Sequence, residues 1–274
     1  MSVPPWLAKL RADADQPPLR PRAPLWAGTA QIGSVEPELI KEIERQRIPY
    51  MNKLLLKIEQ KGIVGWQLQG TPTHSLAHLA QILRDAGLAA AWRDEQLAVA
   101  DAAGQVIATV ERAVVRALGI ATCAVHLVGA APDGYVWVQQ RAFTKPNDPG
   151  LWDTLVGGMV SATDCLDTAL ERETWEEAGL RLSSLHALRP IGEWTIRRPS
   201  PDSGGTGYVV EHIHGYACTL PEGVEPVNQD GEVQGFALRA PELLAQQLEE
   251  GVFTDDARLV LADYLEVDRY VNTK

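Results

Sequence analysis

Residues 157–180 of the chain read GGMVSATDCLDTALERETWEEAGL. Apolar residues recur in this stretch at helical spacing, which predicts a helix over about residues 163–178. The start of the helix has the spacing of a capping box, with Ser161 followed three residues later by Asp164 in place of the usual Glu. Gly179 predicts the end of the helix, because glycine is the residue type that most often stops one.

Three carboxylates, those of Glu173, Glu176 and Glu177, continue the apolar face of this helix toward its C-terminal end. At about 100° per residue they span roughly one third of the helix circumference. Carboxylates at this spacing repel one another by roughly a few tenths of a kcal/mol per pair, and the C-terminal end of a helix dipole favours cations. Hard carboxylate oxygens that converge at the rim of a core suit Mg²⁺ or Mn²⁺. The helix therefore predicts a metal site rather than a solvated acidic face.

This spacing resembles the Nudix box, Gly-x5-Glu-x7-Arg-Glu-U-x-Glu-Glu-x-Gly-U, where U is a bulky apolar residue. The positions that match in register are Gly158, Arg172, Glu173, Glu176, Glu177, Gly179 and Leu180. Two positions depart from it: Asp164 replaces the first Glu and Thr174 replaces an apolar residue. The resemblance implies an α/β (α+β) Nudix fold, in which a mixed β-sheet is sandwiched between helices, preceded here by a small α/β N-terminal domain.

The resemblance also implies roles for the matching residues. The implied metal ligands are Glu173, Glu176, Glu177 and the backbone carbonyl of Gly158. Arg172 would orient a carboxylate, which a bidentate guanidinium does well. The implied reaction is attack by water at a diphosphate phosphorus, assisted by metal ions that neutralise phosphate oxygens. The family usually adds a catalytic Glu from outside the box. The candidate is Glu232, on a loop after the last predicted strand, with Glu211 next; an exposed turn acid is the alternative for Glu232.

Shorter motifs elsewhere resemble one Nudix subgroup, the set related to the Nudix portion of thiamine pyrophosphokinase-type proteins, which bear an extra N-terminal domain. They are WRDE (92–95), ERA (111–113), VHL (125–127), PGLWD (149–153) and PVNQDGEV (226–233). This resemblance implies hydrolysis of thiamine diphosphate, or of its damaged oxo and oxy forms, to the monophosphate. The first domain would close over the organic end with aromatic and acidic groups. The candidate substrate-binding residues are Arg141, Lys145, Trp92 and Arg197.

Other functions stay open on the sequence. A nucleotide sugar, ADP-ribose or an oxidised nucleotide could replace the thiamine-type substrate. Isopentenyl diphosphate isomerase also resembles Nudix proteins, but residues 151–157 lack the cysteine that it places before the box. A binding-only sensor would commonly lose box carboxylates, which this chain keeps. His212 and His214 share a strand face, where a packed pair is a commoner arrangement than a zinc site.

Charge and composition indicate the domain organisation and the partners. The chain has 274 residues and a formal net charge of −11. Residues 1–118 carry 14 Lys and Arg against 12 Asp and Glu, whereas residues 119–274 carry 11 against 24. The prediction is a proline-rich irregular arm over residues 1–34, an accessory domain over 35–118 and the Nudix hydrolase domain over 119–274. An acidic second half argues against a nucleic-acid polymer as partner.

The same composition suggests a cytoplasmic protein. The three cysteines are scattered, which fits reduced thiols, and neither a signal peptide nor a membrane span is visible. The expected partner is a small-molecule diphosphate, and a homodimer stays open. Hydrophobic periodicity and turn residues predict the secondary structure. The predicted helices cover residues 36–46, 78–86, 163–178, 241–249 and 254–266, and the predicted strands cover the hairpin 54–67, a strand around 97, 106–110, 121–129, 135–140, 152–156, 191–197 and 208–218.

Overall fold

A mixed seven-stranded sheet organises the second half of the chain. The computed structural model describes residues 3–45 and 54–272. The sheet runs in the order β11-β12-β7-β8-β13, while β10 pairs with β7 and β9 pairs with β8. Only the β12–β7 pair is parallel among the described pairs of this sheet. The strands are β7 (Thr122–Ala130), β8 (Val136–Arg141), β9 (Trp152–Asp153), β10 (Val156–Met159), β11 (His186–Ser200), β12 (Gly207–Thr219) and β13 (Val233–Arg239).

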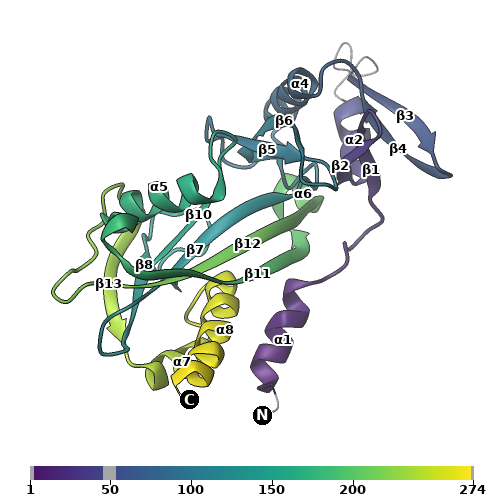
Figure 1. Ribbon diagram of the computed structural model, residues 1–274. Helices are drawn as coiled ribbons and strands as arrows, with labels where there is room; N and C mark the ends of the chain where they lie inside the picture. Colours follow the sequence, from purple (N-terminus) through teal and green to yellow (C-terminus); the bar gives the residue numbers. More distant parts are fainter. Residues whose placement is uncertain (1–2, 46–53, 273–274) are drawn as a thin grey trace.

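Helices cover both faces of this sheet (Figure 1). Side chains alternate between the two faces along a strand, so β7 serves two cores. Val125 and Leu127 pack with helix α5, whereas Ala124 and Val128 pack with α1, α7 and α8. The helices are α1 (Pro5–Ala14), α5 (Leu166–Ala178), α7 (Pro241–Glu250) and α8 (Asp255–Asn272). The arrangement is the mixed sheet between helices that the sequence predicts. Within the described residues, no helix combines the length and the apolar character that a membrane span needs.

The first part of the chain has a core of its own. Its four-stranded sheet has the order β2-β1-β4-β3, and β5 and β6 form a separate antiparallel pair. The buried residues of this core run from Leu25 to Ile120 along the chain. The elements are β1 (Ala23–Ala27), β2 (Ala30–Val35), α2 (Pro37–Arg45), β3 (Leu55–Gln60), β4 (Ile63–Leu68), α4 (Pro72–Asp85), β5 (Gln96–Ala100), β6 (Val106–Glu111) and the 3-10 helix η1 (Arg112–Val114).

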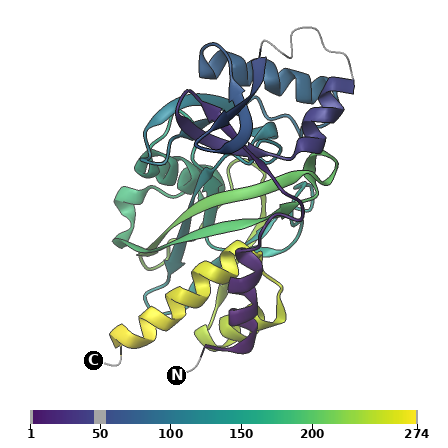
Figure 2. The same cartoon turned by 90° about the vertical axis from the view of Figure 1, so that its right-hand side faces the viewer.

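Backbone hydrogen bonds fasten the first part to the large sheet. The N–H of Tyr208, at the start of β12, donates to the carbonyl of Arg116 at 2.8 Å. The N–H of Ala162, just before α5, donates to the carbonyl of Gln96 at 2.8 Å. The side chain of Arg22 also bridges the two parts, bonding to Thr206. Figure 2 shows the first part lying over the end of the β11–β12 hairpin.

The predicted arm over residues 1–34 is regular over most of its described residues, so its predicted irregular conformation is wrong. Residues 5–14 form α1, and Leu7 and Leu10 are buried in the core that α8 lines. Proline at the first helical position is compatible with a helix, because its missing N–H would have no partner there. Residues 23–35 form β1 and β2 of the first sheet. Figure 2 shows α1 beside α8, so this segment spans both parts of the protein.

The helix that carries the box glutamates begins three residues later than predicted. Its N-cap is Cys165, whose backbone N–H donates to the Thr168 hydroxyl at 2.8 Å. The proposed capping pair is therefore wrong: Ser161 and Asp164 lie in the preceding loop. The Asp164 carboxylate accepts instead from the Arg172 guanidinium, at 2.9 Å from Nε. A charged hydrogen bond of this kind is stronger than a neutral cap.

Other predicted elements agree in type and differ in extent. The predicted helix over 78–86 begins at Pro72, and the predicted strand over 152–156 is two short strands, β9 and β10. Strand β13 follows Glu232 and was not predicted, because Gly235 interrupts it and its side chains show no clear alternation of burial. Gln46, at the end of the predicted helix over 36–46, lies outside the described residues.

Candidate active site

Glu177 lies at the bottom of the site with its side chain almost fully buried. Its Oε2 accepts hydrogen bonds from the backbone N–H of Gly157 at 2.9 Å and from the Gln139 amide at 2.8 Å. Lys145 Nζ lies 3.6 Å from its other oxygen. Burial raises the pKa of Glu177 to about 8, although the lysine and the two hydrogen bonds oppose that rise. The group is held in a defined position in an environment that disfavours its charge.

Glu173 packs directly against the glycine of the loop. A Cβ added to Gly158 would lie 2.0 Å from the carboxyl carbon of Glu173, so a side chain at this position cannot coexist with the observed glutamate. Burial raises the pKa of Glu173 to about 7, against the attraction of Arg172. The resemblance implied that Gly158 and Glu173 act together, and the structure brings them into contact.

Arg172 holds the acidic groups of the box together. Its Nη1 lies 2.7 Å from Glu173 and 3.0 Å from Glu176, and its Nη2 donates to the Met159 carbonyl at 3.2 Å. Since Arg172 also contacts Asp164, it binds three carboxylates and one carbonyl in all. This is the orienting position that the resemblance implied for Arg172, and the substituted Asp164 takes part in it.

The loop before β13 brings Glu232 to the same place. Lys145 Nζ lies 2.5 Å from Glu232 Oε2, and so bridges Glu232 and Glu177. Partial burial opposes ionisation, but the hydrogen bond and charge of Lys145 keep the pKa of Glu232 below its usual value. The Glu232 side chain is about half exposed, at 48%. Glu232 thus reaches the site, although its role as catalytic base stays a prediction.

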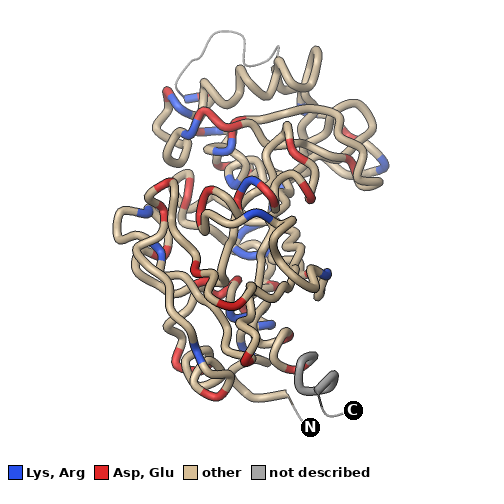
Figure 3. The backbone as a smooth tube through the Cα atoms, turned by 60° about the vertical axis from the view of Figure 1, so that its left-hand side comes forward, with Lys and Arg blue, Asp and Glu red and all other residues tan. Residues whose placement is uncertain are grey.

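These groups surround a cavity of about 320 Å³, here called the box cleft. Of the residues predicted to contact substrate, Arg141 and Lys145 line it. Arg141 Nη1 lies 3.3 Å from Asp153, and its Nη2 donates to the Asn147 carbonyl at 3.0 Å. The cleft is strongly charged, because its lining combines the box carboxylates with arginine and lysine. Figure 3 shows acidic positions throughout the second part of the chain.

The structure does not bring two predicted contact residues to the cleft. The Trp92 indole N–H donates to Asp94 at 2.7 Å, and Arg84 stacks on its ring at 4.3 Å from the centroid. Arg197 forms an exposed pair with Asp15, at 2.8 Å from its Nε. Neither Trp92 nor Arg197 is among the residues that line the box cleft. The Trp92 and Arg197 side chains contact neighbouring residues outside the cleft, and these contacts could not be predicted from the residue types alone.

The donor set fits a divalent cation, although the carboxylates are engaged by protein groups. Within residues 3–45 and 54–272, no three His, Cys, Asp or Glu side chains already form a metal cage. Glu173 and Glu176 are held by Arg172, and Glu177 by Gly157 and Gln139. The carboxylate oxygens of Glu173 and Glu177 are nevertheless the donors that Mg²⁺ or Mn²⁺ prefers, and a bound cation would offset the cost of desolvating their charges.

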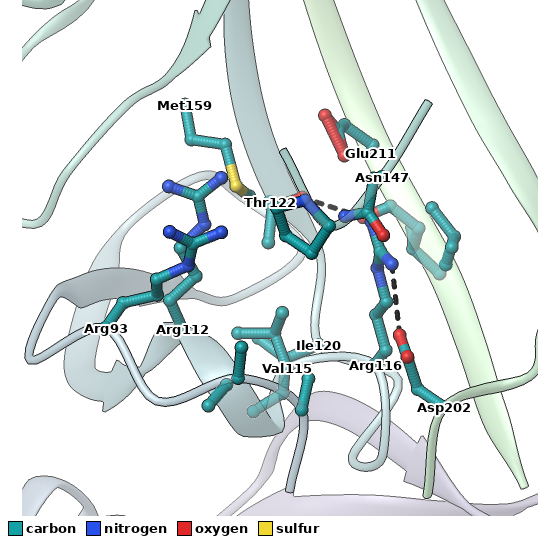
Figure 4. Close-up of a pocket in the computed structure, with 16 residues that line it drawn as sticks. Arg93, Arg112, Val115, Arg116, Ile120, Thr122, Asn147, Met159, Asp202 and Glu211 are labelled. Carbon is teal, nitrogen blue, oxygen red and sulfur yellow. Dashed lines mark hydrogen bonds and ion pairs between the residues drawn. The ribbon is translucent and has the colours of Figure 1, made fainter. Parts of the chain in front are cut away.

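Sequence reasoning expected the first part of the chain to bring aromatic and acidic groups to the substrate, and it missed the arginines that this part contributes. A second cavity of about 270 Å³, here called the interdomain cavity, adjoins the box cleft (Figure 4). Arg93, Arg112 and Arg116 from the first part line both cavities, as does Glu211 of β12. Two of these arginines lie in short motifs of the sequence, but only the packing of the two parts shows that they face the box.

The comparisons with known proteins agree with the box. A family model described as "NUDIX domain" matches residues 119–260. The chain is 29% identical over 198 residues to Nudix hydrolase 24, chloroplastic, of Arabidopsis thaliana, covering 70% of this chain and 53% of that protein. It is 31% identical over 199 residues to Nudix hydrolase 20, chloroplastic, of the same plant, covering 70% and 52%. The chain thus spans about half the length of these curated relatives. The crystal structure of DR0079 from Deinococcus radiodurans superposes with a TM-score of 0.49 at 22% identity, covering 62% of this chain and 99% of that one.

Proposed function

The chain belongs to the Nudix family, and from this premise we propose that it is a divalent-metal-dependent hydrolase that cleaves a diphosphate linkage of a small molecule. The observation that carries the proposal is the packing of two glutamates, the largely buried Glu173 and the buried Glu177, against Gly157 and Gly158. Desolvating ionised carboxylates costs free energy, and carboxylates with raised pKa values in a cleft cluster at functional sites. Binding of Mg²⁺ or Mn²⁺ would offset this cost.

The residues of the chain divide the chemistry between them. Glu173, Glu176, Glu177 and the Gly158 carbonyl would hold the cation, which when bound neutralises phosphate charge and lowers the pKa of the attacking water. Arg172 keeps Glu173 and Glu176 in place through its two short contacts. Glu232 would accept a proton from the attacking water, and Lys145 keeps the pKa of this carboxyl low enough for it to be ionised.

We further propose that the substrate is thiamine diphosphate or a damaged form of it, and that the product is the monophosphate. The support is the set of subgroup motifs in the sequence together with the acidic lining of the cleft, which suits a cationic thiazolium. Among the described residues, no Trp, Tyr or Phe lines either cavity. Recognition of the cation would therefore depend on carboxylates rather than on the aromatic faces expected from the sequence.

Formation of monophosphate from a panel of diphosphates tests both the proposed hydrolase activity and the proposed substrate. The purified chain would be incubated with thiamine diphosphate, ADP-ribose, a nucleotide sugar and an oxidised nucleotide, each with Mg²⁺ or Mn²⁺, and monophosphate would be quantified. We expect metal-dependent cleavage, with thiamine diphosphate or an oxidised analogue preferred. Cleavage of ADP-ribose or a nucleotide alone would overturn the proposed thiamine-type substrate. If no diphosphate in the panel were cleaved, the proposed hydrolase activity would be overturned.

A further inference from the structure

The interdomain cavity is placed to receive the organic group of a diphosphate held at the box. It shares Arg112, Met159 and Glu211 with the box cleft, so the two cavities adjoin. Its volume of about 270 Å³ lies just below the usual range of small-molecule pockets. A compact ring system fits this size better than a dinucleotide.

The walls of this cavity differ in chemistry. Short aliphatic side chains line part of it, among them Val115 and Ile120 from the first part of the chain and Val209 from β12. Figure 4 shows the guanidinium groups of Arg93 and Arg112 on one side and Glu211 on another. The cavity therefore offers an apolar surface for a ring, cations on the side that joins the box cleft, and one carboxylate.

The side chain of Glu211 has no hydrogen bond or ion pair in the part of the chain that the structure describes. The arginines that act electrostatically on Glu211 form ion pairs with other carboxylates. Arg116 Nη1 lies 3.0 Å from Asp202, and Arg112 Nη1 lies 2.7 Å from Glu95. Arg198, on the neighbouring strand β11, pairs with Asp255 at 3.0 Å.

The surroundings make this carboxylate costly to keep charged. Burial, and the nearby Asp256 carboxylate at the start of α8, raise the pKa of Glu211, while Arg116, Arg112 and Arg198 oppose that rise. A ligand that fills the cavity would displace water from this half-buried carboxylate, which has no protein donor to replace it. A ligand that donates a hydrogen bond would remove this cost.

We infer that Glu211 is the specificity-determining residue of the enzyme, accepting a hydrogen bond from an amino group or protonated ring nitrogen of the substrate's organic group. The inference rests on the proposed function, because the diphosphate must be held at the box for the organic group to reach β12. It narrows the substrate to diphosphate esters of compact, nitrogen-bearing rings.

The test compares two diphosphate esters that differ in this donor. Thiamine diphosphate carries an amino group, and isopentenyl diphosphate carries no nitrogen. In Glu211→Gln we expect KM for thiamine diphosphate to rise about 10- to 100-fold with kcat nearly unchanged, the scale of a hydrogen bond to a charged group. Any slow hydrolysis of isopentenyl diphosphate should keep its KM. Glu211→Asp, which keeps the charge but shortens the reach, should give an intermediate KM.

Binding of thiamine monophosphate, measured by calorimetry, provides a readout that does not need turnover. We expect Glu211→Gln to weaken this binding by the same factor. The matched control is Glu193→Gln on the adjacent strand, where the side chain is 79% exposed and should not affect either measurement. Thermal melting confirms that each variant is folded.

The outcomes separate this inference from the proposed function. Equal changes of KM for both esters, or unchanged binding of thiamine monophosphate in folded Glu211→Gln, would overturn the role of Glu211 while leaving the hydrolase intact. Loss of all hydrolysis in the wild-type chain would overturn the proposed function, and the monophosphate binding would still decide the role of Glu211.

Discussion

The buried Glu177 lines the box cleft and the half-buried Glu211 lines its junction with the interdomain cavity, and these two carboxylates differ in their partners. Glu177 in the box cleft accepts two hydrogen bonds and faces Lys145. The Glu211 side chain in the interdomain cavity, among the described residues, has neither a hydrogen bond nor an ion pair. The protein thus positions the first carboxylate itself and leaves the second to a ligand. The difference separates residues that would perform the chemistry from residues that would choose the substrate.

The largest expected effect on turnover comes from replacing the carboxylate of Glu177. Glu177→Gln keeps the shape of the side chain but should lower kcat on the order of 1000-fold, the scale seen when one transition-state electrostatic contact is lost. Folding should survive or improve, because glutamine carries no group whose ionisation burial would penalise. Steady-state kinetics with Mg²⁺ and thermal melting check both. Glu171→Gln on the same helix is the control, and near-normal turnover in folded Glu177→Gln would contradict the metal-ligand assignment.

A second prediction concerns the contact between Gly158 and Glu173. The methyl group of Gly158→Ala would overlap the Glu173 carboxyl group, which Arg172 holds in place. Displacing that carboxylate should lower kcat on the order of 100-fold, the scale of a misplaced catalytic group. Metal titration by calorimetry should show weaker binding. Unchanged metal affinity and turnover would mean that Glu173 is not a ligand in this position.

Substitution of Glu232 tests whether a residue outside the box takes part in catalysis. Glu232→Gln should lower kcat on the order of 10- to 100-fold and leave KM within a few-fold, because a base acts on the transition state rather than on binding. The control is Glu222→Gln, an exposed acid in the turn that follows β12. An unchanged kcat would return Glu232 to the role of a surface ion-pair partner of Lys145.

The raised pKa values predict how the metal-free protein responds to pH. Glu177 has a pKa of about 8 when folded, above the value of 4.5 for a free glutamate, so the folded state retains a proton that the unfolded state releases. The stability that this proton confers is present below about pH 4.5 and is lost as pH rises toward 8. Thermal melting in the presence of a chelator should show this fall, and Glu177→Gln should make it shallower. An identical slope in the variant would contradict the burial of the charge.

The smallest effect is expected far from both cavities. Arg197→Ala removes an exposed pair with Asp15 between β11 and the residue after α1. Exposed pairs contribute little to stability, so the melting temperature should fall slightly and the kinetics should not change. A rise in KM would restore Arg197 as a substrate contact, contrary to its position outside the cleft.

The box site was readable from sequence because its parts are close along the chain. Gly158, Arg172, Glu173 and Glu177 lie within one turn-and-helix unit, so helical spacing places the three side chains on one face. Motif spacing likewise brought Glu232 into consideration, although the strand that follows it was not predicted. The hairpins and most helices were predicted because periodicity and turn residues act locally.

The interdomain cavity could not be read in the same way. Arg93, Arg112 and Glu211 come from segments separated by up to about 120 residues, and contacts such as the hydrogen bond from Tyr208 to Arg116 bring them together. The helical fold of residues 5–14 had the same origin, since Leu7 and Leu10 gain their burial from α8. The sequence by itself determined the family, the box and the predicted chemistry. Only the tertiary structure decided which charged groups face the box without a partner, because burial and pairing depend on contacts between distant segments.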